Sequence, residues 1–337
     1  MPPPRTVLLA ALLSASLSAG GCGQASSSPA TEPSSQTPAV QEGAPQEPPQ
    51  EPPPSGRSQD DAGGVACGCA EYGPARAVGS LGAALNETSG LAASRTAPGV
   101  LYAHNDSGDG PRLFALDGSG ASLGELAITG ASAVDWEDVA VGPCGASSKK
   151  TCIWIGDVGN NAKTRTDLAL YAVDEPPLDG KPFTKKALAA RKYPLRYPDG
   201  NYDCETLLVH PTTGEILLVA KTGGTDARIY RVPEPLTPDV LVTLEAVGSA
   251  AGTAGKQITG GDVSPCGDRV LLRAYFGLFE YAVPSGATVA TALAGLPRDV
   301  PMAFELQSEA VAYRVDGLGY FTAPEGKGAA LSFVGCK

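Results

Sequence analysis

The chain has 337 residues, of which 18% are charged, and its formal net charge is −11. An acidic surface of this kind repels the phosphates of nucleic acids and of anionic lipids, so neither is expected as a partner. It suits cations, a cationic ligand or simple solubility.

The first residues have the order of a bacterial export signal. Arg5 precedes an apolar stretch that starts at Val7 and is too short to span a membrane. Small residues then lead to Cys22, which resembles the lipobox of bacterial lipoproteins, although Ala19 stands where Leu is usual. The resemblance implies that residues 1–22 contain a lipoprotein signal peptide and that Cys22 is acylated, which would anchor the chain in a membrane. Ordinary secretion with cleavage nearby is the alternative.

Residues 23–66 are rich in Pro, Ser, Gln and Glu and poor in apolar side chains. Such a segment buries too little apolar surface to offset its chain entropy, so a disordered, extended tether is expected. The mature protein is therefore expected in the cell envelope, lipid-anchored and facing the periplasm or the exterior. We expect it to be a monomer.

Residues 67–337 form the folded domain in this interpretation. From Leu81 onward, helical periodicity is almost absent, and short apolar runs alternate with turn residues, as at 100–103, 152–155 and 215–219. Many short strands at short spacing predict an all-β domain.

The strands also repeat in a regular order. A polar residue or glycine opens one strand of each unit, and these openings lie 48, 68, 56 and 48 residues apart, at Ser89, Glu137, Glu205, Gly261 and Glu309. Blades of β-propellers are four-stranded units of about 40–50 residues, so the spacing predicts a propeller with insertions in its second and third units. Five blades account for the chain if the segment 75–81 supplies a strand to the short last unit. Six blades stay open as an alternative.

Four motifs resemble a group of secreted bacterial β-propeller proteins that is similar to the SdiA-regulated and phytase-esterase-like propellers. They are Ser89-Gly90-Leu91-Ala92-Ala93-Ser94, His104-Asn105-Asp106-Ser107-Gly108-Asp109, Asp135-Trp136-Glu137-Asp138-Val139-Ala140 and Gly156-Asp157-Val158-Gly159-Asn160-Asn161. The resemblance covers about residues 85–313, and it implies a fold much more strongly than a reaction.

Export permits disulfide bonds. Cys144 and Cys152 bracket a polar turn and are expected to pair. Cys336, next to the last residue, is expected to pair with Cys67 or Cys69 and so to join the two ends of a closed ring. An odd number of cysteines follows Cys22, so at least one is left over.

A propeller brings two sets of loops to one face, because the inner strand of each blade starts where the second strand ends. The expected residues before or at the start of inner strands are Glu87, Asp135, Glu137, Asp138, Asp203, Glu205, Asp262 and Glu309. Those after second strands are His104, Asn105, Asp106, Asp109, Asp157, Asn160, Asn161, Lys221 and Arg273.

Several carboxylates at one rim raise one another's pKa unless protons, basic partners or a hard cation relieve the repulsion. We expect a metal ion on Glu137, Asp138, Glu205 and Asp262, with calcium as the candidate cofactor and no other cofactor. The ligand rim is expected at His104, Asn105, Asp106, Asp157, Asn161, Lys221, Arg273 and Glu309. Lys221 and Arg273 would neutralise part of the rim. The plainer interpretation is that these residues form turns and cap neighbouring loops.

Three functions stay open from the sequence. The favoured one is an envelope-anchored propeller that binds an unidentified small molecule or protein at the acidic rim. The second is a metal-assisted hydrolase of the lactonase, esterase or phytase kind, in which the cation activates water. The third is a structural envelope protein whose rim holds no ligand. No residue is assigned a catalytic role, because a serine nucleophile motif is lacking.

Overall fold

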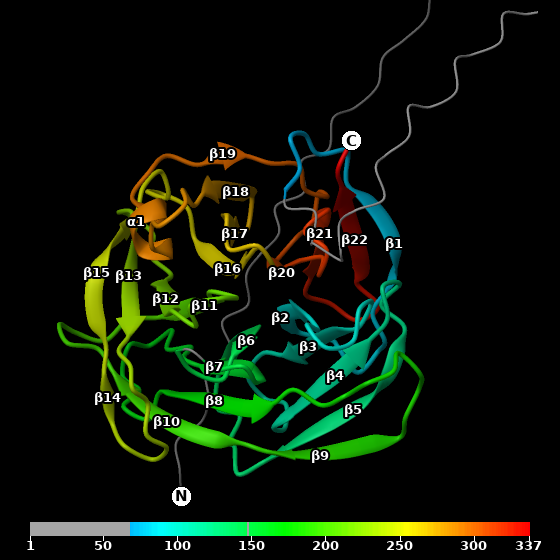
Figure 1. Ribbon diagram of the computed structural model, residues 1–337, viewed down its shortest axis with the longest axis horizontal. Coiled ribbons are helices and arrows are strands. Elements are labelled where there is room, and N and C mark those ends of the chain that lie inside the picture. The colour runs from blue at the N-terminus through cyan, green and yellow to red at the C-terminus, as the bar shows by residue number, and fades with distance from the viewer. Residues whose placement is uncertain (1–67, 147) are drawn as a thin grey trace, which may run out of the picture. The chain divides into compact units, whose positions relative to one another are not determined.

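A computed structural model describes residues 68–146 and 148–337. They form five β-sheets arranged around a common centre, which is the β-propeller that the strand spacing predicts (Figure 1). Five blades are confirmed and six are not. The helix found in the described part is the short α1 (Val289–Leu293), and no helix there is long and apolar enough to cross a membrane. The expected signal peptide, Cys22 and tether lie outside the described residues.

The inner strands of the blades surround the centre. All their residues are buried, because each strand packs against its sheet neighbour and against the inner strands of the adjacent blades. Each of the five residues expected to open a unit lies in one of these strands. They are β2 (Thr88–Ala93), β6 (Trp136–Pro143), β11 (Cys204–Val209), β16 (Ile258–Val263) and β20 (Ser308–Tyr313).

Blades 1 and 2 each carry a fifth strand that comes from a later part of the chain. Blade 1 has the order β2, β3 (Leu101–Asn105), β4 (Arg112–Leu116), β5 (Ser122–Thr129) and β9 (Lys185–Ala189). Blade 2 has the order β6, β7 (Thr151–Asp157), β8 (Ala169–Asp174), β10 (Arg191–Arg196) and β14 (Val242–Thr243). Both extra strands, β9 and β14, pair in parallel with their neighbours and cover edges that would otherwise be open. They account for the long second and third units.

The other three blades have four strands each. Blade 3 continues from β11 with β12 (Ile216–Ala220), β13 (Ala227–Val232) and β15 (Glu245–Ala250). Blade 4 continues from β16 with β17 (Arg269–Ala274), β18 (Gly277–Ala282) and β19 (Arg298–Asp299). Blade 5 contains β20, β21 (Gly319–Pro324), β22 (Ala330–Gly335) and β1 (Arg76–Ser80).

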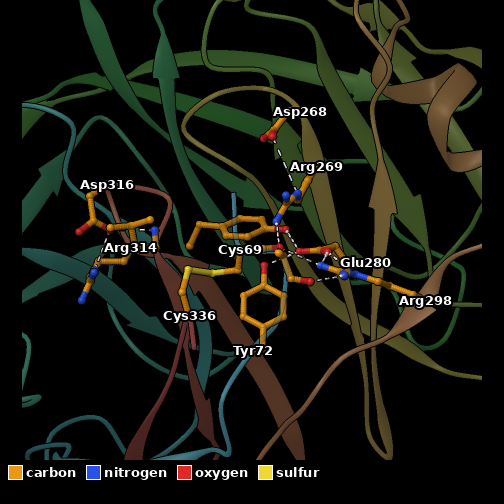
Figure 2. The surroundings of a disulfide bond; sticks show 12 residues. Cys69, Tyr72, Asp268, Arg269, Glu280, Arg298, Arg314, Asp316 and Cys336 are labelled. Atoms are coloured by element: carbon orange, nitrogen blue, oxygen red, sulfur yellow. Dashed lines mark hydrogen bonds and ion pairs between the residues drawn. A yellow bond between two sulfur atoms is a disulfide. The ribbon is translucent and has the colours of Figure 1, made fainter. Parts of the chain in front are cut away.

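The ring is closed within blade 5, because β1 from the start of the described chain pairs with β22 from its end. This confirms the strand expected at 75–81. A disulfide between Cys69 and Cys336 joins the same two ends, as one of the two expected pairings has it (Figure 2). Tyr72 strengthens the closure, since its hydroxyl donates a 2.5 Å hydrogen bond to the buried Glu280 of blade 4.

The other cysteines of the described residues are either disulfide-bonded or free. Cys144 and Cys152 form the expected short disulfide across the β6–β7 turn. Cys266 also takes part in a disulfide. Cys204 is a free thiol buried in β11.

Two buried aspartates link the inner strands of neighbouring blades. Asp138 accepts hydrogen bonds from the backbone N–H of Val139 (2.8 Å) and, across the blade boundary, of Leu207 (2.9 Å). Asp262 does the same from blade 4 to blade 5, accepting from the N–H groups of Val263 and Tyr313, each at 2.8 Å. Neither aspartate belongs to a group of carboxylates in the described residues that lie close enough to share a metal ion, so the expectation that these two residues are metal ligands gains no support.

Replacing Asp138 by Asn should lower the free energy of unfolding by about 2 kcal/mol. The amide of Asn has a single acceptor oxygen, whereas two buried N–H groups each donate to a separate oxygen of Asp138. Chemical denaturation measures this loss. Calcium binding by the Asp138→Asn variant should equal that of the wild type. A variant of unchanged stability that no longer bound calcium would restore Asp138 as a ligand.

Candidate functional site

Two of the inner strands begin with the same short pattern, and this pattern builds the site. Asp135 and Glu137 stand at the start of β6, and Asp203 and Glu205 stand at the start of β11, each as Asp-x-Glu. The pairing register of β6 with β7 and of β11 with β12 is interrupted at the Glu in each case. Such a bulge adds one residue to a strand and redirects a side chain.

Five carboxylates from three blades gather where the inner strands β6 and β11 begin, and we call them the mouth cluster: Asp106, Asp135, Glu137, Asp203 and Glu205. Candidate ligand oxygens of Asp106, Asp135 and Glu137 lie within 4.8 Å of one another. The same holds for Glu137, Asp203 and Glu205. Glu137 therefore belongs to both groups. Asp106 follows β3, so the loops after second strands do meet those before inner strands, as expected.

The two glutamates of the mouth cluster are buried, with 3% of Glu137 and 4% of Glu205 exposed. Burial and the neighbouring carboxylates, Glu205 first among them, raise the pKa of Glu137 well above its usual value. Burial raises the pKa of Glu205 to about 7 and that of Asp135 to about 6. Oε2 of Glu205 finds no hydrogen-bond partner among the described residues.

Lys221, just after β12, is the basic residue of the mouth. Its ammonium group donates to Oε1 of Glu205 and, at 2.9 Å, to the hydroxyl of Tyr275. Although burial opposes it, the Glu205 carboxylate raises the pKa of Lys221, so the lysine is charged. One ammonium group balances one of the five carboxylates of the mouth cluster, which leaves the cluster strongly acidic.

The end of β7 and the loop after it form hydrogen bonds to the mouth cluster. Oδ1 of Asp157 accepts hydrogen bonds from the N–H of Asp135 (3.0 Å) and from Arg165 (2.8 Å). Asp203 accepts from the backbone N–H of Asn160 at 2.8 Å. Asp157 and Asn160 therefore position ligands of the cluster, whereas Asn161 is exposed beside them.

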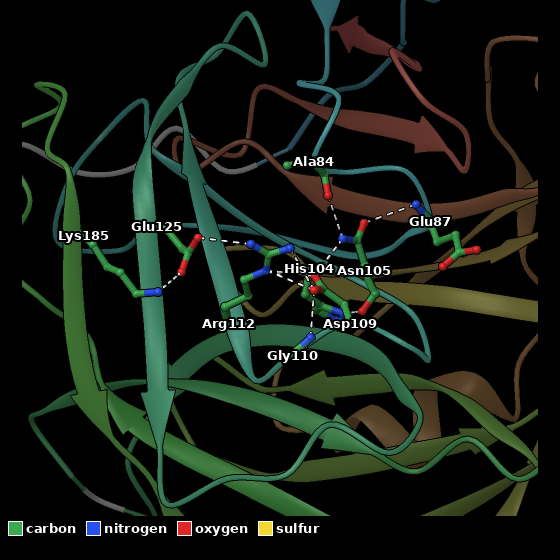
Figure 3. A network of polar contacts seen from close by, with 9 residues as sticks. All are labelled: Ala84, Glu87, His104, Asn105, Asp109, Gly110, Arg112, Glu125 and Lys185. Atoms are coloured by element: carbon green, nitrogen blue, oxygen red, sulfur yellow. Dashed lines mark hydrogen bonds and ion pairs between the residues drawn. The ribbon is translucent and has the colours of Figure 1, made fainter.

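His104 and Asn105 belong to the framework of blade 1 and not to an open rim, which corrects that expectation (Figure 3). The side chain of Asn105 donates to the carbonyl of Ala84 and to Asp109, both at 2.8 Å, and accepts from the N–H of Glu87 at 3.2 Å. His104 is fully buried, and burial lowers its pKa to about 4, so the ring is neutral.

The expectation that Arg273 lies in the ligand rim is also wrong, because its side chain has no exposed surface. It pairs with Glu305, which also accepts a 3.1 Å hydrogen bond from Thr322 of blade 5. This buried pair joins blades 4 and 5.

Glu309 does lie near the mouth: burial, together with the charges of Glu325 and Glu205, raises its pKa to about 9, so its carboxyl is protonated at neutral pH.

Asp106, which is expected in the ligand rim, is not among the expected metal ligands, and neither are Asp135 and Asp203, although both are expected on this face. The signal that identifies them is the repeated Asp-x-Glu at the start of two inner strands. It places the Asp just outside the strand and the Glu at the bulge, so that both carboxylates join the mouth cluster.

A cavity of about 860 Å³ lies elsewhere, and His210, Glu215, Arg231 and Asp268 are among the residues that line it. Nδ1 of His210 accepts from the N–H groups of Thr212 (3.1 Å) and Thr213 (3.0 Å), and Glu215 pairs with Arg231. These polar groups maintain local structure, so the mouth cluster is the stronger site candidate.

Comparison with known proteins gives distant likenesses. No protein-family model matches the sequence, and no curated protein matches it significantly. Among solved structures, a gluconolactonase from Xanthomonas campestris is similar with a TM-score of 0.40 and 10% identity, over 71% of this chain and 69% of that one. The structure of U3-55K (0.34, 9%) and the RRP9 WD40 repeats (0.36, 10%) each match 74% of this chain and 67% of their own. At this distance none of them informs function, which rests on the residues of the mouth.

Proposed function

We propose that this chain is an envelope-displayed propeller that binds a divalent cation at the mouth cluster, with calcium as the first candidate, and uses it to hold a ligand. The observation that carries the proposal is the buried, unpartnered Oε2 of Glu205 beside the carboxylates of Glu137 and Asp203. An oxygen atom in this position costs free energy unless a proton or a cation satisfies it.

The chemistry of the mouth cluster favours a hard cation. Calcium takes six to eight oxygen ligands at about 2.3–2.6 Å, and carboxylates are its common protein ligands. All five side chains of the cluster offer only oxygen atoms, and the buried part of the cluster contains no histidine or cysteine ligand among the described residues. This set does not suit zinc or copper, which prefer nitrogen and sulfur ligands.

Display at the envelope is the second part of the proposal. It is supported by the export signal, the lipobox-like sequence that ends at Cys22 and the proline-rich segment that follows. The resemblance of the four motifs to secreted bacterial propellers of the SdiA-regulated and phytase-esterase-like kind agrees with it. Mass spectrometry of the mature N-terminus should find a diacylated or triacylated Cys22. A free N-terminus beyond Cys22 would contradict this part alone.

A metal-assisted hydrolase is the alternative function. Three protein carboxylates around a cation would leave ligand positions for water or substrate, as in catalytic metal sites. Calcium-dependent turnover of chromogenic lactones, carboxylic esters or phosphate esters would support this reading. Lack of turnover in a protein that binds calcium supports the binding function instead.

Calcium titration of the chelator-stripped mature chain tests the proposal. Calorimetry should show saturable binding, and calcium at a hundred times its Kd should stabilise the protein by about 2.7 kcal/mol. Glu205→Gln should weaken binding at least tenfold. Glu125→Gln is the matched control, because Glu125 is an ion-paired acid on β5, outside the mouth cluster, and should leave binding unchanged. Wild-type protein that binds no calcium at millimolar concentration would contradict the proposal.

A further inference from the structure

The mouth cluster consists of two groups of three carboxylates that share one residue. Asp106, Asp135 and Glu137 form the outer group, and Glu137, Asp203 and Glu205 form the inner group. We infer that the mouth binds two divalent cations, one in each group, with Glu137 as the bridging carboxylate. This inference rests on the proposed function and extends it from one ion to a pair.

The geometry of each group fits one cation. Two oxygen atoms bound to the same calcium ion at about 2.3–2.6 Å lie at most about 5 Å apart. The ligand oxygens within each group meet that limit, because all lie within 4.8 Å of one another. A carboxylate that belongs to two such groups is the usual bridge in sites where two metal ions lie about 3.5–4 Å apart.

Each group also contains a carboxylate oxygen that accepts no hydrogen bond from the described residues, on a side chain that is almost fully buried. In the inner group this atom is Oε2 of Glu205. In the outer group it is Oε1 of Glu137, since the hydrogen bond to the side chain of this residue, from Ser89 at 3.5 Å, goes to Oε2. A Cβ atom on Gly159 would collide with both Glu137 Oε1 and Asp135 Oδ2, so these two oxygens converge on one point beside the Gly159 backbone.

The charges agree with a pair of ions. Five ionised carboxylates and the Lys221 ammonium group leave the mouth cluster with four negative charges. Two divalent cations neutralise these four charges, whereas a single one leaves two.

The two positions differ in access to solvent. Every carboxylate of the inner group is buried, and Lys221 lies against it, whereas Asp106 and Asp135 of the outer group are half-buried. The inner ion therefore connects the starts of strands β6 and β11, where its ligands lie. The outer ion keeps coordination positions open to solvent, and it is the one that can hold an oxygen-bearing ligand.

Metal stoichiometry of the full mature chain tests this inference, with CaCl2 and MnCl2 as probes. Equilibrium dialysis and elemental analysis should give two ions per chain for the wild type and for the control Glu125→Gln. Asp106→Asn should retain only the inner ion and Glu205→Gln only the outer ion. Glu137→Gln, which weakens both positions, should lower the affinity of each at least tenfold. Circular dichroism verifies that each variant is folded.

Manganese gives a second readout that is independent of affinity. Two Mn²⁺ ions bridged by Glu137 should produce a spin-coupled spectrum in electron paramagnetic resonance, and Asp106→Asn should convert it to the spectrum of an isolated ion. One ion per chain in the wild type would overturn the pair but leave the proposed function standing. Two ions that survive in Asp106→Asn, without spin coupling, would also overturn it. No bound ion at all would overturn the proposed function itself.

Discussion

Replacing both Cys69 and Cys336 by Ser should lower the free energy of unfolding by about 4 kcal/mol. The disulfide closes a loop with a sequence separation of 267 residues, and it joins the two chain ends that complete blade 5. A cross-link over so long a loop removes much conformational freedom from the unfolded chain. Differential scanning calorimetry should show a decrease in Tm of about 10 °C for a domain of this size.

The short disulfide provides the matched control. Cys144 and Cys152 are only 8 residues apart, so replacing both by Ser should cost about 2 kcal/mol, clearly less than the long cross-link. If the two double variants lost equal stability, loop closure would not be the reason for the effect. If the Cys69/Cys336 variant melted like the wild type, β1 and the contact of Tyr72 with Glu280 would suffice to close the ring.

Without calcium, the protein should become less stable as the pH rises from 5 to 9. The pKa of Glu309 is raised to about 9, and those of Glu205 and Asp135 to about 7 and 6, with burial as the first cause in each case. A carboxyl group with a raised pKa binds its proton more tightly in the folded state, so its stabilising contribution is lost as the pH rises through that pKa. The total loss should be on the order of several kcal/mol.

Calcium should counteract this loss, because it binds the ionised carboxylates of the mouth cluster. The increase in Tm on adding CaCl2 in place of EGTA should therefore be large at pH 8 and small at pH 5. Glu309→Gln isolates the other contribution: it should flatten the pH dependence in EGTA while the calcium-induced increase persists. An increase in Tm at pH 5 that equals or exceeds that at pH 8 would contradict ionised carboxylates as the ligands.

Much of the fold follows from local sequence signals. The polar residues that open the inner strands recur at nearly regular spacing, and this predicts both the blade count and the strand at 75–81 that closes the ring. The sequence does not predict the parallel pairing of β9 with β5 or of β14 with β10. Both added strands are short and mostly exposed, so nothing in their side-chain pattern specifies a partner far away in the chain.

The sequence predicts that polar residues from two sets of loops meet on one face, and Asp106, Asp135 and Glu137 do lie close together, but it does not predict the role of each residue there. Adjacent residues on a strand point to opposite faces, so Glu137 reaches the mouth while Asp138 turns to the backbone of blade 3. Residue type alone does not separate these two carboxylates. His104 lies within β3 and Arg273 within β17, and not in the loops after these strands. Both side chains are buried, so tertiary packing decides their role.

Anomalous diffraction from crystals soaked in MnCl2 tests the central claim most directly. The account predicts anomalous density at the mouth cluster, with Mn²⁺ bound to Glu137, Asp203 and Glu205, and with Glu125 and Asp138 free of metal. Crystals with manganese only at other acidic residues, or with no anomalous density at the mouth cluster at pH 8, would contradict it.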